Sequence, residues 1–189
     1  MEMPAEVKRA IDDAKSRMDK SLAELGNAYS LIRSGRATPG LVEDIRVEAY
    51  GQTVPLNQVA NITVPEAKLI NIDVWDKSTV ASIEKAILKS GRNLNPMVDG
   101  ARIRIAIPEL TEERRKEYVK VARQKSEDFK VAIRNIRRDT NDAIKRMKIE
   151  GVSEDQMRQY QDNVQKITDE HIKKIDELYS HKESEILKV

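Results

Sequence analysis

The sequence contains no cysteine and only two histidines. The absence of cysteine excludes disulfides, thiolate nucleophiles, iron–sulfur clusters and cysteine-based zinc sites. His171 and His181 stand in a spacing that fits neither an HExxH pair nor another short metal-ligand motif. We therefore expect no metal, no cofactor and no catalytic residue. We expect His171, on an apolar helical stripe, to be packed and hydrogen-bonded, and His181 to lie at the surface.

Long apolar runs are also missing. No stretch approaches the ~20 apolar residues of a membrane span. The first residues, Met1–Ile11, contain Glu2, Glu6, Lys8 and Arg9 and lack the apolar core of a signal peptide. We expect a cytoplasmic protein that makes no membrane contact. Its 189 residues can form one large or two small domains with a buried core.

Apolar residues recur every three or four positions at both ends of the chain. The pattern runs from Pro4 to Arg33, returns from Thr111 to Glu150, and continues after a capping-box signature formed by Ser153 and Gln156. This spacing predicts three long amphipathic helices. Because each helix leaves one apolar stripe to cover, we expect the three to pack against one another.

The intervening segment 34–107 is rich in glycine and proline and contains short β-branched runs. These runs predict strands, and Val80–Ile87 has helical spacing within a predicted helix over 78–90. Trp75, at the end of one run, is expected to pack in the core of this segment. The predicted strands are a hairpin of Ile45–Tyr50 and Thr53–Leu56 around Gly51-Gln52, with 62–64, 69–74 and 103–107.

The predicted fold class is α+β, a three-helix bundle built from both chain ends that carries an inserted small β/α/β domain. The bundle domain comprises 1–33 and 108–189, and the inserted domain comprises 34–107. The chain passes between the two domains twice, and glycine and proline at these two crossings favour a hinge there. The expected hinge residues are Arg33, Ser34, Gly35, Ile107, Pro108 and Glu109.

The net charge of +2 conceals an uneven distribution. Arg114–Lys148 contains 13 basic and 5 acidic residues, a net charge of +8, whereas 149–189 has 6 basic and 10 acidic residues, a net charge of −4. The middle helix is therefore the electropositive element. Its seam-flanking cations at helical spacing are Lys116, Lys120, Arg123, Lys130, Arg134, Arg137, Lys145 and Lys148.

Such a strip is either a solvated helix face or a nucleic-acid-binding surface. Arginine suits bidentate contacts with phosphate. Only Tyr118 and Phe129 among the seven aromatic residues fall within the basic segment, which argues against base stacking and favours backbone contacts with structured RNA. The candidate RNA-binding residues are Arg134, Arg137, Arg138, Lys130, Arg123 and Lys120.

Several segments together resemble the bacterial ribosome recycling factor family, in the same order and over almost the whole chain. They are Ile32–Pro39, Tyr50–Leu56, Leu94–Pro96, Leu110–Lys116, Val131–Asp139 and Val164–Asp169. The resemblance implies a monomeric translation factor, not an enzyme. It would join elongation factor G and GTP after termination to split the ribosome into subunits, releasing mRNA and tRNA.

The resemblance further implies that the bundle contacts 23S rRNA of the large subunit through the basic middle helix, where Arg134 and Arg137 match, with Arg138 and Lys130 beside them. The inserted domain would be the part that the elongation factor moves, pivoting at the two junctions.

Two other function classes remain open from the residues alone. A helical scaffold would bind another protein through its bundle, with the basic strip merely solvating it, and would expose an apolar patch. An RNA-processing or phosphate-transfer enzyme would need a convergent acid/base or metal site, which this sequence does not supply.

Overall fold

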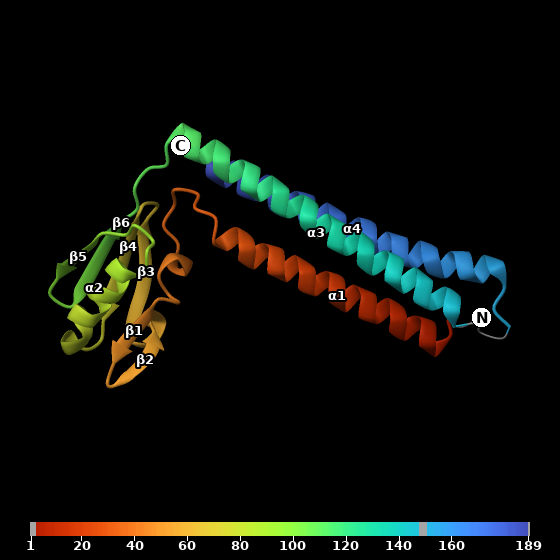
Figure 1. The fold of residues 1–189 in the computed structure, drawn as a ribbon, viewed down its shortest axis with the longest axis horizontal. Helices are drawn as coiled ribbons and strands as arrows, with labels where there is room; N and C mark the ends of the chain where they lie inside the picture. The colour runs from red at the N-terminus through yellow and green to blue at the C-terminus, as the bar shows by residue number, and fades with distance from the viewer. Residues whose placement is uncertain (1–2, 148–150, 189) are drawn as a thin grey trace. The chain divides into compact units, whose positions relative to one another are not determined.

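The computed structural model describes residues 3–147 and 151–188 (Figure 1). Three long helices, α1 (Ala5–Ser30), α3 (Glu112–Arg146) and α4 (Glu154–Leu187), come from the two ends of the chain. Six strands and one further helix, α2 (Val80–Lys89), lie between α1 and α3. The predicted fold class is confirmed.

By their contacts, the described residues form two compact units. The helical unit combines the residues up to Ile32 with those from Arg115 onward, and the sheet unit is Arg33–Arg114. The second boundary between the units, between Arg114 and Arg115, thus lies later in the chain than the boundary expected between residues 107 and 108. The segment after Ile107 stays with the sheet unit because Ile107 donates its N–H to the Lys68 carbonyl at 2.8 Å and Glu109 forms an ion pair with Lys68.

The apolar stripes of the three long helices form the core of the helical unit, as the sequence predicts. Met18 and Leu25 of α1, Ile133 of α3 and Ile175 of α4 are fully buried in one cluster. A buried polar contact joins α1 to α3, because the Tyr29 hydroxyl donates to the Ala122 carbonyl at 2.8 Å. Burial of the phenol raises the pKa of Tyr29 to about 12. The three helices are therefore held mainly by apolar burial.

The predicted helix starts are also confirmed. The Thr111 hydroxyl accepts from the Arg114 N–H at 3.2 Å, immediately before α3. Ser153 and Gln156 form both bonds of a capping box, with the Gln156 N–H bound to the Ser153 hydroxyl and the Ser153 N–H bound to the Gln156 side chain. These side chains satisfy donors that the first turn of a helix leaves unpaired. Residues 148–150, at the predicted end of the middle helix, lie outside the described residues.

The sheet unit contains a hairpin and an antiparallel sheet. Strands β1 (Arg46–Ala49) and β2 (Gln52–Pro55) form the hairpin. The four-stranded sheet has the order β3-β4-β6-β5. Its strands are β3 (Ala60–Glu66), β4 (Leu69–Val74), β5 (Pro96–Asp99) and β6 (Arg102–Ala106).

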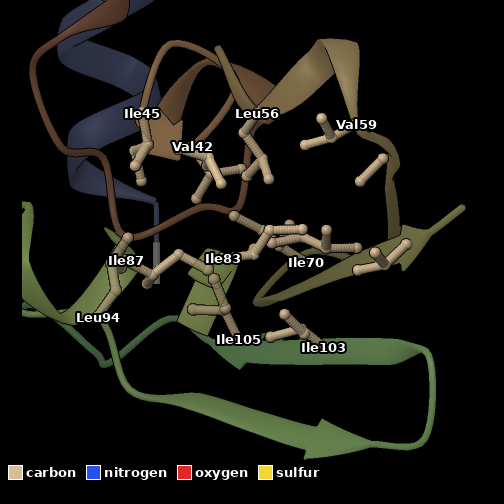
Figure 2. Close-up of a cluster of buried hydrophobic side chains, with 14 of the residues drawn as sticks. Val42, Ile45, Leu56, Val59, Ile70, Ile83, Ile87, Leu94, Ile103 and Ile105 are labelled. Atoms are coloured by element: carbon tan, nitrogen blue, oxygen red, sulfur yellow. The ribbon is translucent and has the colours of Figure 1, made fainter. Parts of the chain in front are cut away.

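Helix α2 supplies the apolar core of the sheet unit from one side. Ile83 and Ile87 point toward Ile70 of β4 and toward Ile103 and Ile105 of β6 (Figure 2). All five side chains are almost completely buried. Side chains alternate along a strand, so the polar residues between these isoleucines lie on the opposite face of the sheet.

Three local predictions about this unit are wrong. The sequence predicts no strand at 96–99, where the structure has β5. The hairpin turns at Tyr50-Gly51 instead of Gly51-Gln52, since Ala49 pairs with Gln52 and both turn residues have positive φ. Trp75 is 67% exposed because it follows the last buried residue of β4, and the isoleucines already fill the core.

Candidate nucleic-acid interface

Helix α3 presents the predicted basic strip on the side that borders α4. Ala122, Ser126, Ile133, Ile136, Thr140 and Ile144 form its buried face. Five of the six candidate cations follow one another at three, four or seven positions, and Arg138 directly follows Arg137 and lies four positions after Arg134, so that the six share one flank of the helix. The structure separates them into two groups of three.

The first group, Arg123, Lys130 and Arg137, contacts α4 at intervals of seven residues. The guanidinium of Arg123 lies 5.9 Å from the centre of the Tyr179 ring. Arg137 Nη1 donates to Gln165 Oε1 at 3.0 Å. These side chains join α3 to α4 along the edge of the core.

Lys130 is the most enclosed of the three, with a side chain 14% exposed. Its Nζ lies 2.6 Å from Asp176 Oδ1 on α4 and 3.2 Å from Glu127 Oε1 on its own helix. The hydrogen bond to Asp176 raises the pKa of Lys130, despite the opposing effect of burial. The positive charge of Lys130 is therefore largely neutralised within the protein.

The second group, Lys120, Arg134 and Arg138, is exposed. In the described part of the chain, none of the three makes a hydrogen bond or an ion pair. Lys145, seven residues beyond Arg138, is also exposed and also makes no hydrogen bond or ion pair with a described residue. These cations retain full charge and hydrogen-bonding capacity for an external anion. Lys148, at the predicted end of the strip, lies outside the described residues.

Asn141 is a strip residue that sequence reasoning missed. It follows Arg134 by seven positions, and its Oδ1 is enclosed with no hydrogen-bond partner among the described residues. Only its spacing from Arg134 could have indicated this position, and a single uncharged residue does not stand out in the sequence of a basic helix. Because this oxygen is enclosed, it is not exposed to an external ligand.

The predicted hinge residues all lie in the sheet unit. Arg33, Gly35, Ile107, Pro108 and Glu109 help line one small cavity of about 40 Å³. Gly35 has φ +76°, a conformation that an L-residue seldom adopts. The side chain of Leu110 lies 3.6 Å from the position that a Cβ on Gly35 would take. The two chain crossings are thus brought side by side.

The two histidines lie in different environments. His171 is packed and hydrogen-bonded in the core, as predicted, and His181 is exposed. Across residues 3–147 and 151–188, no cluster of three or more His, Cys, Asp or Glu side chains could hold a metal ion. Over the same residues, no helix combines the length and apolar character needed to cross a membrane.

Comparisons with known proteins point to one family. The family model described as "Ribosome recycling factor" matches residues 25–187. The ribosome-recycling factor of Desulforamulus reducens is 48% identical over 183 residues, covering 97% of this chain and 100% of that protein. The ribosome-recycling factor of Shouchella clausii is 52% identical over 178 residues, covering 94% and 96%.

Solved structures give the same result. A solution structure of the ribosome recycling factor aligns with a TM-score of 0.80 and 41% identity, covering 99% of this chain and 100% of that one. A second match has a TM-score of 0.67 and 44% identity, covering 96% and 99%. It is the Thermus thermophilus ribosome recycling factor, in models where it and Escherichia coli elongation factor G are bound to the E. coli post-termination complex.

Proposed function

The chain belongs to the ribosome recycling factor family, and we propose on that premise that, with elongation factor G and GTP, it splits post-termination ribosomes into subunits and releases mRNA and tRNA. The family comprises translation factors, not enzymes. The observation that carries the proposal is the match over almost the whole chain, including a relative placed with elongation factor G on the post-termination complex. In this proposal GTP is hydrolysed on the elongation factor.

The helical unit binds 23S rRNA of the large subunit through α3 in this proposal. The support is that Lys120, Arg134 and Arg138, within a segment of net charge +8, are exposed and have no partner among the residues the structure describes. Backbone phosphates are the expected contacts, because phosphate contacts fix position and require no aromatic stacking.

Arg123, Lys130 and Arg137 serve the same interface in a different way. Their contacts with Tyr179, Asp176 and Gln165 hold α4 against α3 and keep the flank rigid. Arg137 uses one nitrogen for Gln165 and has further N–H donors that can reach RNA. Substitution of these three residues would therefore change packing as well as RNA affinity.

The inserted domain 34–107 is the moving part in this proposal, and the bundle of 1–33 and 108–189 is the anchored part. The sequence places the pivot at Arg33–Gly35 and 107–109. Gly35 supports this assignment through its positive φ, whereas Ile107 and Glu109 are tied to Lys68. We therefore place the freedom of the second crossing after Glu109.

The primary test is the splitting of post-termination ribosomes, followed by light scattering. The protein is added alone, then with elongation factor G, and then with elongation factor G and GTP. Splitting that requires all three supports recycling. An unchanged scattering signal with all components, while the protein still binds ribosomes and a known recycling factor splits them, would refute the proposal.

A second test separates the RNA contact from packing. The strip variant carries Arg134→Glu and Arg138→Glu and leaves Arg137, with its Gln165 contact, intact. Its affinity for the large subunit should fall by tenfold or more. The slope of log affinity against log salt should also become shallower by about 1.4–1.8, since about 0.7–0.9 of a counterion is released per neutralised phosphate.

The matched control reverses two other exposed cations, Lys20→Glu and Arg146→Glu. Lys20 follows Arg17 by one turn, and Arg146 lies two turns beyond Asp139, the residue that pairs with Arg17 at 3.5 Å. Both thus lie toward the α1 side of the bundle, away from the strip. An equal loss of affinity in the control would show that only net charge matters, and the strip assignment would then be abandoned.

A further inference from the structure

A second basic surface lies in the sheet unit, in a groove between β1 and α2 of about 460 Å³. This volume falls within the range that proteins use for small ligands. Six charged residues line it, namely Asp44, Arg46, Glu48, Lys85, Lys89 and Arg92. Neither the family match nor the α3 strip accounts for this groove.

Arg92 and Asp44 form the fixed wall of the groove. Arg92 Nη1 donates to the Leu41 carbonyl at 2.7 Å and to Asp44 Oδ1 at 2.8 Å, and Nη2 donates to Asp44 Oδ2 at 3.1 Å. The bond from Arg92 holds the pKa of Asp44 below its ordinary value, so this carboxylate stays ionised and paired. Its charge is therefore not available to oppose an incoming anion.

The other cations of the groove are unpaired. Arg46, Lys85 and Lys89 are exposed, and none forms a hydrogen bond or an ion pair with a residue that the structure describes. Lys85 and Lys89 lie one turn apart on α2, where like charges repel. A bound anion would relieve this repulsion. Two carboxylates line the groove with these cations: Asp44, which pairs with Arg92 and also attracts Arg46, and Glu48.

We propose that this groove binds the phosphodiester backbone of RNA, as a contact of the sheet unit separate from the α3 strip. The inference rests on the proposed function, which brings the protein to an RNA-rich particle. The Ser82 hydroxyl lines the groove and can donate to a phosphate oxygen, whereas the Ser90 hydroxyl already donates to the Ile87 carbonyl. Glu48 can accept a ribose 2′-hydroxyl proton, a donor that an acidic peptide side chain does not bring.

The test uses full-length protein and a fluorescent single-stranded oligouridylate as the probe. The strip variant, Arg134→Glu with Arg138→Glu, serves as the background, so that binding by α3 is suppressed. The groove variant adds Lys85→Gln and Lys89→Gln to it. Anisotropy titrations across a range of KCl concentrations then report RNA affinity and its salt slope.

The groove variant should bind the oligonucleotide at least fivefold more weakly than its background. Its salt slope should be shallower by about 1.4, since two phosphate contacts to a single strand are lost. Glutamine preserves helix propensity and removes the Lys85–Lys89 repulsion, so the melting temperature should be unchanged or slightly higher.

The matched control compares Lys85→Gln with Lys77→Gln in the same background. Lys77 is exposed, precedes α2 and does not line the groove. Unchanged RNA binding in the groove variant, or an equal loss in the Lys77 control, would overturn the proposal. So would a groove that binds polyglutamate more tightly than RNA, since the site would then be one for acidic peptides.

The same variants separate the two proposals when assayed for ribosome splitting. Loss of oligonucleotide binding together with failed recycling by the unmodified protein would refute the proposed function and leave the groove assignment standing. Normal recycling by the unmodified protein with unchanged oligonucleotide binding by the groove variant would refute only the groove.

Discussion

His171 shows how a single buried residue can join distant parts of the chain. Its side chain is 1% exposed. Nδ1 lies 2.6 Å from the Ile167 carbonyl of α4, and Nε2 lies 2.7 Å from Asp19 Oδ1 of α1. The ring of His171 thus contacts an acceptor on each side, one on its own helix and one on α1. The pair therefore links the first and last helices by a charge-assisted hydrogen bond.

This pair predicts that the protein loses stability at acid pH. The hydrogen bond to His171 lowers the pKa of Asp19. A carboxylate whose pKa is lower in the folded state stabilises the fold above its unfolded pKa of ~3.9, and this contribution is lost as the pH falls through the folded value. Asp19→Asn should lower the free energy of unfolding by about 1 kcal/mol at pH 6–7.

Urea unfolding of the two proteins between pH 2.5 and pH 7 provides the measurement. The difference between wild type and Asp19→Asn should shrink below pH 4, because protonated Asp19 no longer differs in charge from asparagine. Asp12→Asn, an exposed change on the same helix with no such partner, is the control. A difference that is constant over the whole pH range would contradict the ionic account.

For individual residues, the sequence predicts where basic side chains lie on a helix better than whether those side chains are free to bind a ligand. Helical spacing predicts that Arg134 and Arg137 lie on one flank. It could not show that Arg137 reaches Gln165, or that Lys130 pairs with Asp176, because those partners lie 28 and 46 positions later in the chain. Partners on another helix depend on packing register, which one-dimensional periodicity does not contain.

Among the elements, α4 depends on a start signal that can be tested alone. The Ser153 hydroxyl accepts from the Gln156 N–H at 3.2 Å, and the Gln156 side chain closes the capping box. Ser153→Ala should destabilise the protein by about 1 kcal/mol, because a first-turn donor loses its partner. Thermal unfolding followed by circular dichroism measures the effect.

Ser180→Ala is the matched control, since Ser180 is an exposed residue in the interior of the same helix. Alanine has the higher helix propensity there, so stability should stay equal or rise by a few tenths of a kcal/mol. If both substitutions changed the melting temperature alike, the cap would have no special role.

The elements that the sequence predicted well are those with a long period. All three long helices repeat their apolar spacing over many turns. Helix α1 begins and ends within a few residues of its predicted bounds, and α3 and α4 begin directly after their predicted caps, Thr111 and Ser153. Strand β5 was missed because its four residues show no burial alternation, with Met97 64% and Val98 44% exposed. An edge strand of this kind is defined by its pairing with β6 and not by its own pattern.

For the whole molecule, the central prediction concerns the proposed pivot. Gly35→Ala places a Cβ on a residue with φ +76°, which costs about 1–2 kcal/mol unless the backbone shifts. If this crossing must change conformation during recycling, the substitution should slow subunit splitting severalfold while ribosome affinity changes less than twofold. Stopped-flow light scattering and pelleting assays measure the two quantities.

Gly100→Ala provides a control with the same kind of strain. Gly100 has φ +61° in the turn between β5 and β6, with open space where a Cβ would be placed. It should reduce thermal stability comparably and leave the splitting rate unchanged. A similar slowing in both variants would mean that stability, and not motion at Gly35, limits the reaction.

The insertion of one unit within the other also has a consequence for synthesis. The sheet unit is one continuous segment and can fold as soon as it leaves the ribosome, whereas α1 must wait for α3 and α4. Its contacts with Ala122 and His171 reach partners 93 and 152 positions away. At ~5–20 residues per second, the apolar face of α1 stays uncovered for roughly ten to thirty seconds. During that interval a chaperone can bind the exposed apolar face of the first helix. In stalled nascent chains, a protease should therefore cut this helix until the last helix has emerged.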